Sequence, residues 1–414
     1  MSPSGGPRAA ALVDRAMVGD ALAELALSAP YTHPDDLPSV IGRAAGMLGA
    51  DDIVLYVADL GQQVLVPMQG RDQPNREVLD IEGTVGGRAY RTESIVPILR
   101  GDGRTQLWVP VQDSAERLGV LRMTFAGVDE SVEQAAKAFT SIVGEYVVTK
   151  SRYGDALERT RRRRPLTLSA ELRWALLPPL TYHSPSCTVT GLVEPSYEIA
   201  GDTFDYAVVG DMVHLAIWDA VGHGLLASRI ANLLVCAYRN SRRSGGRLHE
   251  MYAELDGVVQ SEFGDSLFAT GVLAEIDTID GRLRWVSAGH PAPLLLRGTQ
   301  VIDELHSPPS LPLGLGDGCI QVIEEKQLQP GDTVVFFTDG VTEARSPTGE
   351  HFGLQRLAEH VSRAASAGQR PAETLRRLVA SIVEHQRGVL QDDATVLLAT
   401  WHGPPPEGER SQRR

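Results

Sequence analysis

The chain has 414 residues, of which 43% are hydrophobic and 22% charged, and its formal net charge is −14. These proportions are typical of a globular protein with two or three domains. The acidic balance disfavours nucleic acid as the main partner, and no uninterrupted apolar run is long enough to span a membrane. The three cysteines are odd in number and widely separated, which predicts a reducing compartment, the cytoplasm, rather than a disulfide framework or a cysteine-rich zinc site.

One basic run, RTRRRR at residues 159–164, stands against the acidic balance. Such a run is more often a solvated face of a linker than a nucleic-acid patch. The only lysines are Lys137, Lys150 and Lys326, and none lies in a glycine-rich loop. The GxxxxGK[ST] phosphate cradle of the P-loop nucleotide-binding proteins is therefore absent.

Residues 1–34 predict a helical segment rich in alanine and leucine, which YTHPDDLP at residues 31–38 interrupts. Residues 35–148 predict a compact domain with a short helix, strands at DIVLYVADL and QVLVPM, strands at TQLWVPVQD and RLGVLRMTF, and a closing helix around Phe139. This segment contains no Cys and no His, so neither a thioether-linked bilin nor a His-ligated haem is expected there.

The LWVPV…LGVL pattern of the second strand pair resembles GAF sensor domains. The resemblance implies an α/β sensor fold and allows for a small-molecule ligand whose identity the sequence does not reveal. A scaffold or dimerisation domain without any ligand predicts the same pattern, so both interpretations stay open.

Residues 149–185 predict a helical linker that is interrupted at Pro165. Leu168, Leu172 and Leu176 recur on one helical face, which is typical of packing against the next domain or against a second copy of the chain. We therefore expect a homodimer formed through the linker or through the GAF-like domain.

From residue 186 to residue 402 the chain changes to many short strands rich in Val, Leu and Phe, separated by turn residues. Helices interrupt the strands, and the first of them carries Leu226, Ile230 and Leu233 on its predicted inward face. The pattern predicts an α+β domain with largely antiparallel strands rather than a βαβ repeat. Residues 403–414 predict a disordered tail.

Four aspartates share one local placement. Asp202 and Asp392 precede predicted strands, whereas Asp219 and Asp339 end them. In an antiparallel sheet the start of one strand lies beside the end of its neighbour, so the four carboxylates are expected at one edge. There they would repel each other, and no lysine is near them in sequence, which favours hard divalent cations such as Mg²⁺ and Mn²⁺. Any one of them taken alone is more often a turn former or a helix cap.

Five motifs occur in order in this part of the chain: AGDTFDY (200–206), DAVGHG (219–224), SAGHPAP (287–293), FFTDGVTEA (336–344) and DDATVL (392–397). Together they resemble the SpoIIE/RsbU-like serine phosphatases of the metal-dependent protein phosphatase (PPM) family. The resemblance implies a four-layer αββα sandwich with antiparallel sheets and two metal ions, Mn²⁺ or Mg²⁺, at one end. The chain has Ala200 where the family usually has glycine, a difference of one methyl group that we expect to be tolerated.

The resemblance also implies a role for each residue of the cluster. Asp219 would bridge both ions. Asp202 and the backbone carbonyl of Ala220 would serve one ion, and Asp339 and Asp392 the other. A water held between the ions by these aspartates would attack phosphorus in line, without a phosphoenzyme.

The turn after Asp219 contains Gly222 and Gly224, which allow a sharp turn without a side chain near the ions. His223 lies between them and is a candidate general acid, although a role in the turn is favoured. The role of Asp393 stays open.

The function that the resemblance implies is a protein-serine/threonine phosphatase acting on a phosphorylated STAS-domain protein, an anti-sigma-factor antagonist. No arginine that would grip the substrate phosphate is evident. The alternative is a catalytically silent pseudophosphatase that acts as a sensor or interaction scaffold, but a scaffold has no need for clustered like charges. A calcium- or nucleotide-binding module ranks last because the DxDxDG loop and the P-loop are both absent.

Overall fold

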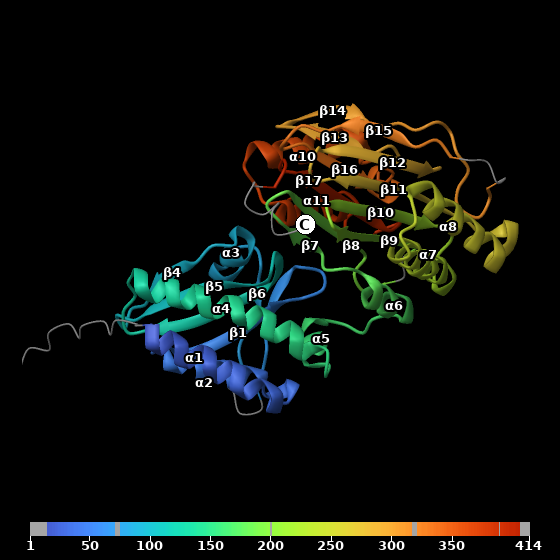
Figure 1. Ribbon diagram of the computed structural model, residues 1–414. Helices are drawn as coiled ribbons and strands as arrows, with labels where there is room; N and C mark the ends of the chain where they lie inside the picture. Colours follow the sequence, from blue (N-terminus) through green and yellow to red (C-terminus); the bar gives the residue numbers. More distant parts are fainter. Residues whose placement is uncertain (1–14, 71–74, 199–200, 317–320, 389, 406–414) are drawn as a thin grey trace, which may run out of the picture. The chain divides into compact units, whose positions relative to one another are not determined.

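The computed structural model describes residues 15–70, 75–198, 201–316, 321–388 and 390–405 (Figure 1). The chain forms two compact units, Met1–Pro165 and Leu166–Arg414. Residues 1–14 of the predicted helical segment, Ala200 of the first motif and the end of the predicted tail, residues 406–414, lie outside the described residues. Among the described helices, none is both long and apolar enough to span a bilayer.

The N-terminal unit is built on a six-stranded antiparallel sheet with the order β3-β2-β1-β6-β5-β4. Its strands are β1 (Asp51–Ala58), β2 (Val64–Pro67), β3 (Leu79–Asp80), β4 (Val96–Leu99), β5 (Thr105–Asp113) and β6 (Glu116–Phe125). Its helices are α1 (Arg15–Ser28), α2 (Leu37–Met47), α3 (Val85–Thr92), α4 (Glu130–Ser151) and α5 (Ala156–Arg161), with 3-10 turns at Ala29–Tyr31 and Pro34–Asp36. The strands and the two helices predicted for residues 35–148 are present, and α3, β3 and β4 are additional.

Both faces of this sheet are covered by helices. On one face α1, α2 and α4 share an apolar core with the sheet, to which Leu25, Ile41 and Phe139 contribute. On the other face α3 packs over Tyr56 and Trp108, whose ring centroids are 5.7 Å apart. The face under α3 is therefore filled by aromatic side chains.

The C-terminal unit contains two antiparallel sheets, with the orders β15-β12-β11-β10-β9 and β14-β13-β16-β17-β8-β7. The strands are β7 (Thr181–His183), β8 (Cys187–Glu194), β9 (Asp202–Val209), β10 (Met212–Ala220), β11 (Ala269–Asp277), β12 (Arg282–Ala288), β13 (Leu294–Arg297), β14 (Gln300–Glu304), β15 (Glu324–Gln327), β16 (Thr333–Phe337) and β17 (Ala394–Trp401). The helices are α6 (Leu168–Leu176), α7 (Leu225–Arg243), α8 (Leu248–Phe263), α9 (Asp339–Thr342), α10 (Gly353–Ser366) and α11 (Pro371–His385), with a 3-10 turn at Gly264–Ser266. The prediction of a mixed α/β domain with antiparallel sheets is confirmed.

Strand β10 shows how the two sheets are packed. Leu215 and Ile217 point into an apolar core that both sheets share, whereas Ala216 and Trp218 point into a second core formed with α7 and α8. This alternation is the two-residue period of a strand that is buried on both faces. On the far side of the second sheet, α10 and α11 form a third core with β16 and β17 (Figure 1).

The leucine stripe predicted for the linker is only partly buried. Leu168 is 64% exposed, whereas Leu176 packs against the core formed with α7 and α8. The fully buried residues of the helix are Ser169, Ala170 and Arg173. Spacing identifies a helical face but does not show which partner the opposite face meets. Here that partner is a group of carboxylates, described below, which attracts an arginine.

The inward face predicted for α7 is also rotated. Leu226 is 42% exposed, while Ala227, Ile230 and Leu234 are buried. Apolar residues occur on both sides of Ile230, so the helical period alone does not determine which side packs against the sheet.

Helix α4 approaches β5 closely at Gly144, so a substitution there tests the packing of the N-terminal unit. A Cβ on Gly144 would lie 1.8 Å from the carbonyl oxygen of Gln112. Gly144→Ala should gain about 1 kcal/mol of helix propensity, but the clash with backbone should cost more, since overpacking typically costs about 1–3 kcal/mol even where side chains can yield. We expect a lower unfolding temperature of the N-terminal unit, measured by circular dichroism.

Gly19 in α1 is the matched control, because a Cβ there would meet no atom within 4 Å. Gly19→Ala should leave the unfolding temperature unchanged or raise it. A stabilising effect of both substitutions would contradict the close approach.

Candidate functional site

The antiparallel register brings two of the predicted site residues together. Asp219 near the end of β10 is directly opposite Asp202 at the start of β9. Both side chains share the strand face of Ile217 and Phe204, which point into the core between the sheets. The two carboxylates therefore lie where that core reaches the edge of the first sheet.

The second sheet supplies the other two aspartates. Asp339 is the first residue of α9, just after β16, and Asp392 lies just before β17. The carboxyl groups of Asp202 and Asp339 are within hydrogen-bonding reach of the Asp219 carboxyl group. The charge of Asp392 acts on both Asp219 and Asp339. The structure thus gathers all four aspartates that the sequence singles out.

Crowding and burial change the acidity of these groups. Burial, followed by the charges of Asp219 and Asp393, raises the pKa of Asp202 well above its usual range. Burial, followed by the charges of Asp339 and Asp392, raises the pKa of Asp219 to about 7. Burial and the charge of Asp392 also raise the pKa of Asp339. Since neighbouring negative charges oppose ionisation, full ionisation of this cluster calls for positive charge close by.

Two threonines hold Asp202 in place across the gap between the sheets. Thr338 Oγ1 donates a hydrogen bond of 2.6 Å to Asp202 Oδ2. The backbone N–H of Thr395 donates to Thr338 Oγ1 at 3.0 Å, and the backbone N–H of Thr338 donates to the Thr395 carbonyl at 3.0 Å. Asp202 on the first sheet is therefore fixed by the ends of β16 and β17 on the second.

The Ala220 carbonyl, the predicted backbone ligand, has space because residue 201 is glycine. A Cβ on Gly201 would lie 2.4 Å from the Ala220 oxygen. The backbone of Gly201 is held from both sides, because its N–H donates to Asp393 Oδ2 at 2.6 Å and its carbonyl accepts from the Ala220 N–H at 3.3 Å. Asp393, whose role the sequence left open, thus fixes the segment that leads into Asp202.

The turn that follows Asp219 has the backbone that its glycines suggested. Gly222 and Gly224 adopt φ angles of +91° and +84°, in the left-handed region that favours glycine. His223 between them is exposed, and α7 begins directly afterwards. This position suits the role in the turn that the sequence favours for His223.

Arg173 in α6 is a residue that the sequence analysis missed. It is only 4% exposed, and its Nη2 donates to the carbonyl oxygen of Pro195. Burial lowers its pKa, whereas the charges of Asp393, Glu194 and Asp202 raise it. Burial still prevails at Asp393, whose pKa rises to about 7 although the charge of Arg173 opposes the rise. The available signal was the spacing in LSAELRWAL, where Arg173 follows the small residues Ser169 and Ala170 by about one helical turn.

The third motif, SAGHPAP, supports the strand next to Asp219. His290 Nδ1 lies 2.8 Å from Thr270 Oγ1, and Thr270 on β11 is directly opposite Asp219 on β10. Burial lowers the pKa of His290 to about 3, so its imidazole is neutral at physiological pH. His290 therefore acts here as a half-buried, neutral hydrogen-bonding group.

A pocket of about 490 Å³ lies beside the segment that carries Asp339. Phe337 and Thr342, which flank Asp339 in sequence, line it together with Leu305, Leu354 and the SAGHPAP segment. The lining is rich in prolines and apolar side chains. The aspartates themselves are not among the lining residues.

The donor set of the cluster fits hard divalent cations in its chemistry. It consists of carboxylate oxygens and one backbone carbonyl that Gly201 leaves accessible. Within the described residues, however, no three side chains of His, Cys, Asp or Glu are already arranged so that they could hold one ion.

Comparison with known proteins agrees with these features. Residues 210–402 match the family model described as stage II sporulation protein E (SpoIIE). Protein IcfG of Synechocystis sp. is 26% identical over 241 residues, which are 51% of this chain and 37% of that protein. The phosphoserine phosphatase RsbU of Bacillus subtilis is 24% identical over 237 residues, which are 56% of this chain and 69% of that protein.

A solved structure, the RsbU and RsbW domains of Rv1364c from Mycobacterium tuberculosis, is 28% identical with a TM-score of 0.45, covering 54% of this chain and 63% of that one. The chain thus spans little more than a third of IcfG and about two thirds of RsbU. The matched family segment runs from β10 to the end of β17 and includes Asp219, Asp339 and Asp392. Residues 210–402 therefore belong to the SpoIIE family of phosphatase domains.

Proposed function

We propose that this protein is a metal-dependent protein-serine/threonine phosphatase. The observation that carries the proposal is the gathering of Asp202, Asp219, Asp339 and Asp392 between two sheets. The last three lie in the segment that matches the SpoIIE family, and Asp202 lies eight residues before it. Buried carboxylates that raise one another's pKa values destabilise the fold. Such clusters are therefore typical of functional sites. The relative RsbU is named a phosphoserine phosphatase, which supports the same activity for this chain.

We also infer that the layers of the C-terminal unit form the αββα sandwich of the PPM family. The pair α7 and α8 would be one outer layer and the pair α10 and α11 the other, with the two sheets between them. The shared core of the sheets and the separate core under each helix pair support this assignment.

In the proposed centre, Asp219 would serve both of two ions, Mn²⁺ or Mg²⁺. Asp202 and the Ala220 carbonyl would hold one ion, and Asp339 and Asp392 the other. Such ions, when bound, supply an activated water and neutralise the phosphoryl oxygens.

Other residues of the chain prepare this centre. Thr338 orients Asp202, Gly201 leaves the Ala220 oxygen accessible, and Arg173 offsets part of the negative charge. These contacts keep the donor atoms in a narrow range of positions before any substrate binds.

The proposed substrate is a phosphorylated STAS-domain protein, as the resemblance to the RsbU-like phosphatases implies. The pocket of about 490 Å³ would receive an apolar part of the substrate protein, because its lining is largely apolar and includes Phe337 and Thr342 on either side of Asp339 in sequence. The alternative is a silent pseudophosphatase, which would have no need for clustered carboxylates that raise one another's pKa values.

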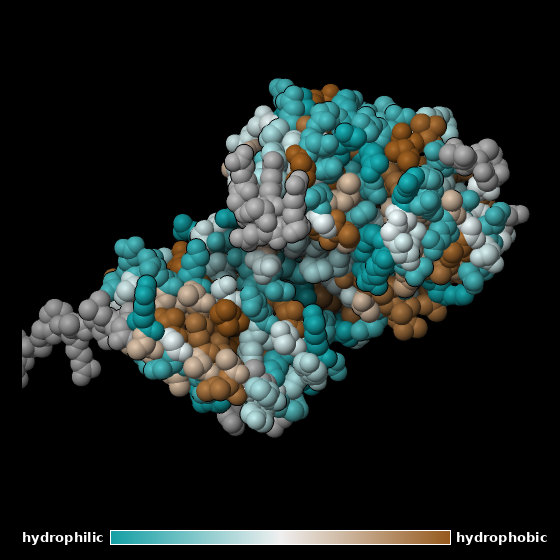
Figure 2. All heavy atoms as spheres, viewed as in Figure 1, coloured by the Kyte–Doolittle hydropathy of each residue, from teal (hydrophilic) through white to brown (hydrophobic). Residues whose placement is uncertain are grey.

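The N-terminal unit is proposed to be a GAF-like sensor that regulates the phosphatase in the cytoplasm. Its helices also suit the expected homodimer. Figure 2 shows apolar side chains gathered over α1 and α4, where Leu27 is 75% and Ile142 39% exposed. Contiguous exposed apolar surface of this kind is typical of interaction sites.

The aspartates provide the first test of the proposed activity. Asp219→Asn and Asp339→Asn should each lower p-nitrophenyl phosphate hydrolysis in Mn²⁺ by more than about 100-fold, since outer partners of a metal site alone are worth about 10- to 100-fold. Both variants should stay folded by circular dichroism, because each removes one negative charge from a repelling cluster. Asp280→Asn, in an exposed hairpin of the same sheet, is the control and should keep its activity. Full activity of Asp219→Asn, or of the parent protein in excess EDTA, would overturn the proposal.

The independence of the two units provides the second test. A truncated protein beginning at Leu166 keeps α6, Arg173 and the aspartate cluster, and it should still hydrolyse p-nitrophenyl phosphate in Mn²⁺. A protein beginning at Leu177 lacks α6 and should be less stable, because Arg173 is lost. A well-folded but inactive protein from Leu166 would show that the N-terminal unit contributes to catalysis.

Arg173 provides the third test, through stability rather than turnover. Arg173→Gln should lower the stability of the metal-free protein, since losing one partner of buried opposite charges typically costs about 3–5 kcal/mol. Added Mn²⁺ should then raise the melting temperature more in this variant than in the parent, because the cations offset a larger uncompensated charge. Arg173→Lys should lie in between, and Arg243→Gln at the exposed end of α7 should behave like the parent. Equal metal-induced shifts in all four proteins would refute this role of Arg173.

A further inference from the structure

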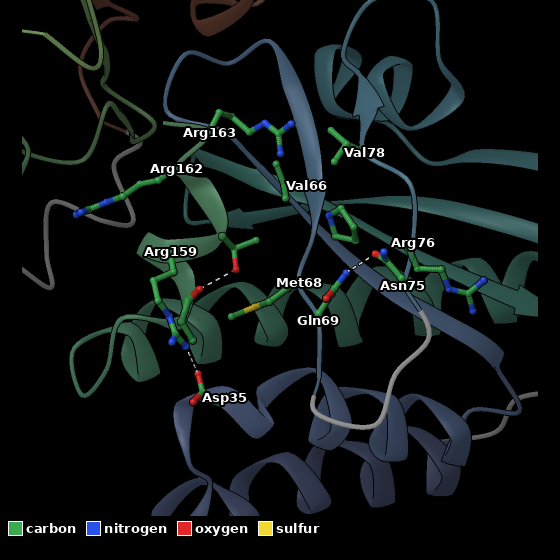
Figure 3. Close-up of a pocket in the computed structure, with 13 residues that line it drawn as sticks. Asp35, Val66, Met68, Gln69, Asn75, Arg76, Val78, Arg159, Arg162 and Arg163 are labelled. Carbon is green, nitrogen blue, oxygen red and sulfur yellow. Dashed lines mark hydrogen bonds and ion pairs between the residues drawn. The ribbon is translucent and has the colours of Figure 1, made fainter. Parts of the chain in front are cut away.

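The basic run at residues 159–164 has no part in the proposed phosphatase centre. The structure places its beginning in α5, and Arg159, Arg162 and Arg163 line a pocket of about 400 Å³ in the N-terminal unit, although the guanidinium group of Arg162 points away from it (Figure 3). The sequence analysis favoured a solvated face of a linker for this run, whereas in the structure part of it forms one wall of a cavity.

The floor of this pocket is apolar and comes from β2. Val66, Pro67 and Met68 line it, and Ala156 of α5 adds a further apolar surface. Strand β3 pairs only with Val64 and Leu65, so among the described residues no strand continues the sheet beside the end of β2. The end of β2 is thereby accessible from the side that faces α5.

The opposite wall is polar. Asn75 and Arg76 line the pocket there together with Gln69, whose Nε2 donates a hydrogen bond of 2.6 Å to Asn75 Oδ1. Figure 3 shows this pair of amides across the cavity from Arg159. Amide and guanidinium groups thus lie around one apolar floor.

Among the described residues that line this cavity, arginines outnumber carboxylates. Arg76, Arg159, Arg162 and Arg163 line it, against one carboxylate, that of Asp35. Arg159 pairs with Asp35 and Arg76 pairs with Asp52, but Asp52 is shared with Arg122 at 2.8 Å. In a chain with a net charge of −14, such a local excess of guanidinium groups is a specific feature of this place.

We propose that this pocket binds a small organic anion. The arginines would hold a phosphate or carboxylate group, for which the planar guanidinium is the best-matched side chain. The apolar part of the molecule would lie on Val66, Pro67 and Met68. The volume falls within the range of small-molecule sites. The opposite face of the sheet, under α3, is already filled by Tyr56 and Trp108, so the ligand site is at the β2 edge. The inference does not depend on phosphatase activity.

The test uses the full-length protein with isotope-labelled methionine methyl groups and the probe 1-anilinonaphthalene-8-sulfonate, an aromatic molecule with one anionic group. Met68 is 4% exposed and lines the pocket, so its methyl resonance reports occupancy of this site. We expect that resonance, assigned with Met68→Leu, to shift and saturate as the probe is added. Displacement by adenosine monophosphate would identify a phosphate site, and displacement by benzoate a carboxylate site.

Three variants separate this site from general attraction of anions. Arg159→Gln combined with Arg163→Gln should weaken binding about tenfold or more, as expected for loss of charge-assisted hydrogen bonds. Val66→Phe leaves the charge unchanged and should weaken binding by filling the floor. Arg164→Gln removes the same charge from the same run but does not line the pocket, and it should leave the affinity within about twofold.

Two outcomes would overturn the proposal. Binding of the probe without any change at the Met68 methyl group would place the probe elsewhere. An equal loss of affinity per removed charge in Arg164→Gln and in the double variant would show that only net charge matters.

Discussion

Repulsion among buried carboxylates is the interaction on which the C-terminal unit depends most. Asp202, Asp219 and Asp393 are all held at pKa values above their usual range by burial and by the charges of neighbouring aspartates. The fold accommodates this with the hydroxyl of Thr338, the N–H of Gly201 and the guanidinium of Arg173. None of these removes the excess negative charge, and cations would do so.

Strand β9 carries two aspartates with different surroundings, Asp205 among arginines and Asp202 among other carboxylates. Comparing them distinguishes a structural ion pair from a candidate functional group. Asp205 faces the helices, where Arg239 and Arg242 of α7 bind it at 2.7 and 3.0 Å. Asp202, three residues earlier, faces the other sheet and has no such pair of arginines. The first arrangement is that of a buried ion-pair network that attaches α7 to the sheet. The second leaves charge available for a ligand, as expected of a functional site.

The N-terminal unit distributes its polar groups differently. Both faces of its sheet are filled by apolar and aromatic side chains, so a polar site can form only at an edge. The short strand β3 leaves the end of β2 open, and the arginines after α4 come to that place because α5 packs beside β2. A short strand and a short helix thus create a cavity that neither would form alone.

The sequence by itself determined the strands, the turn glycines and the four aspartates of the site. Alternation along a strand and the placement of acids at strand ends are local properties, and the antiparallel register then brought Asp202 and Asp219 together. Only the tertiary structure decided which face of α6 is buried, that Asp393 holds Gly201, and that residues 159–163 line a pocket. Each of these depends on contacts between residues far apart in the chain. Arg173 is buried because Asp393, 220 positions later, lies beside it, and no local pattern contains that information.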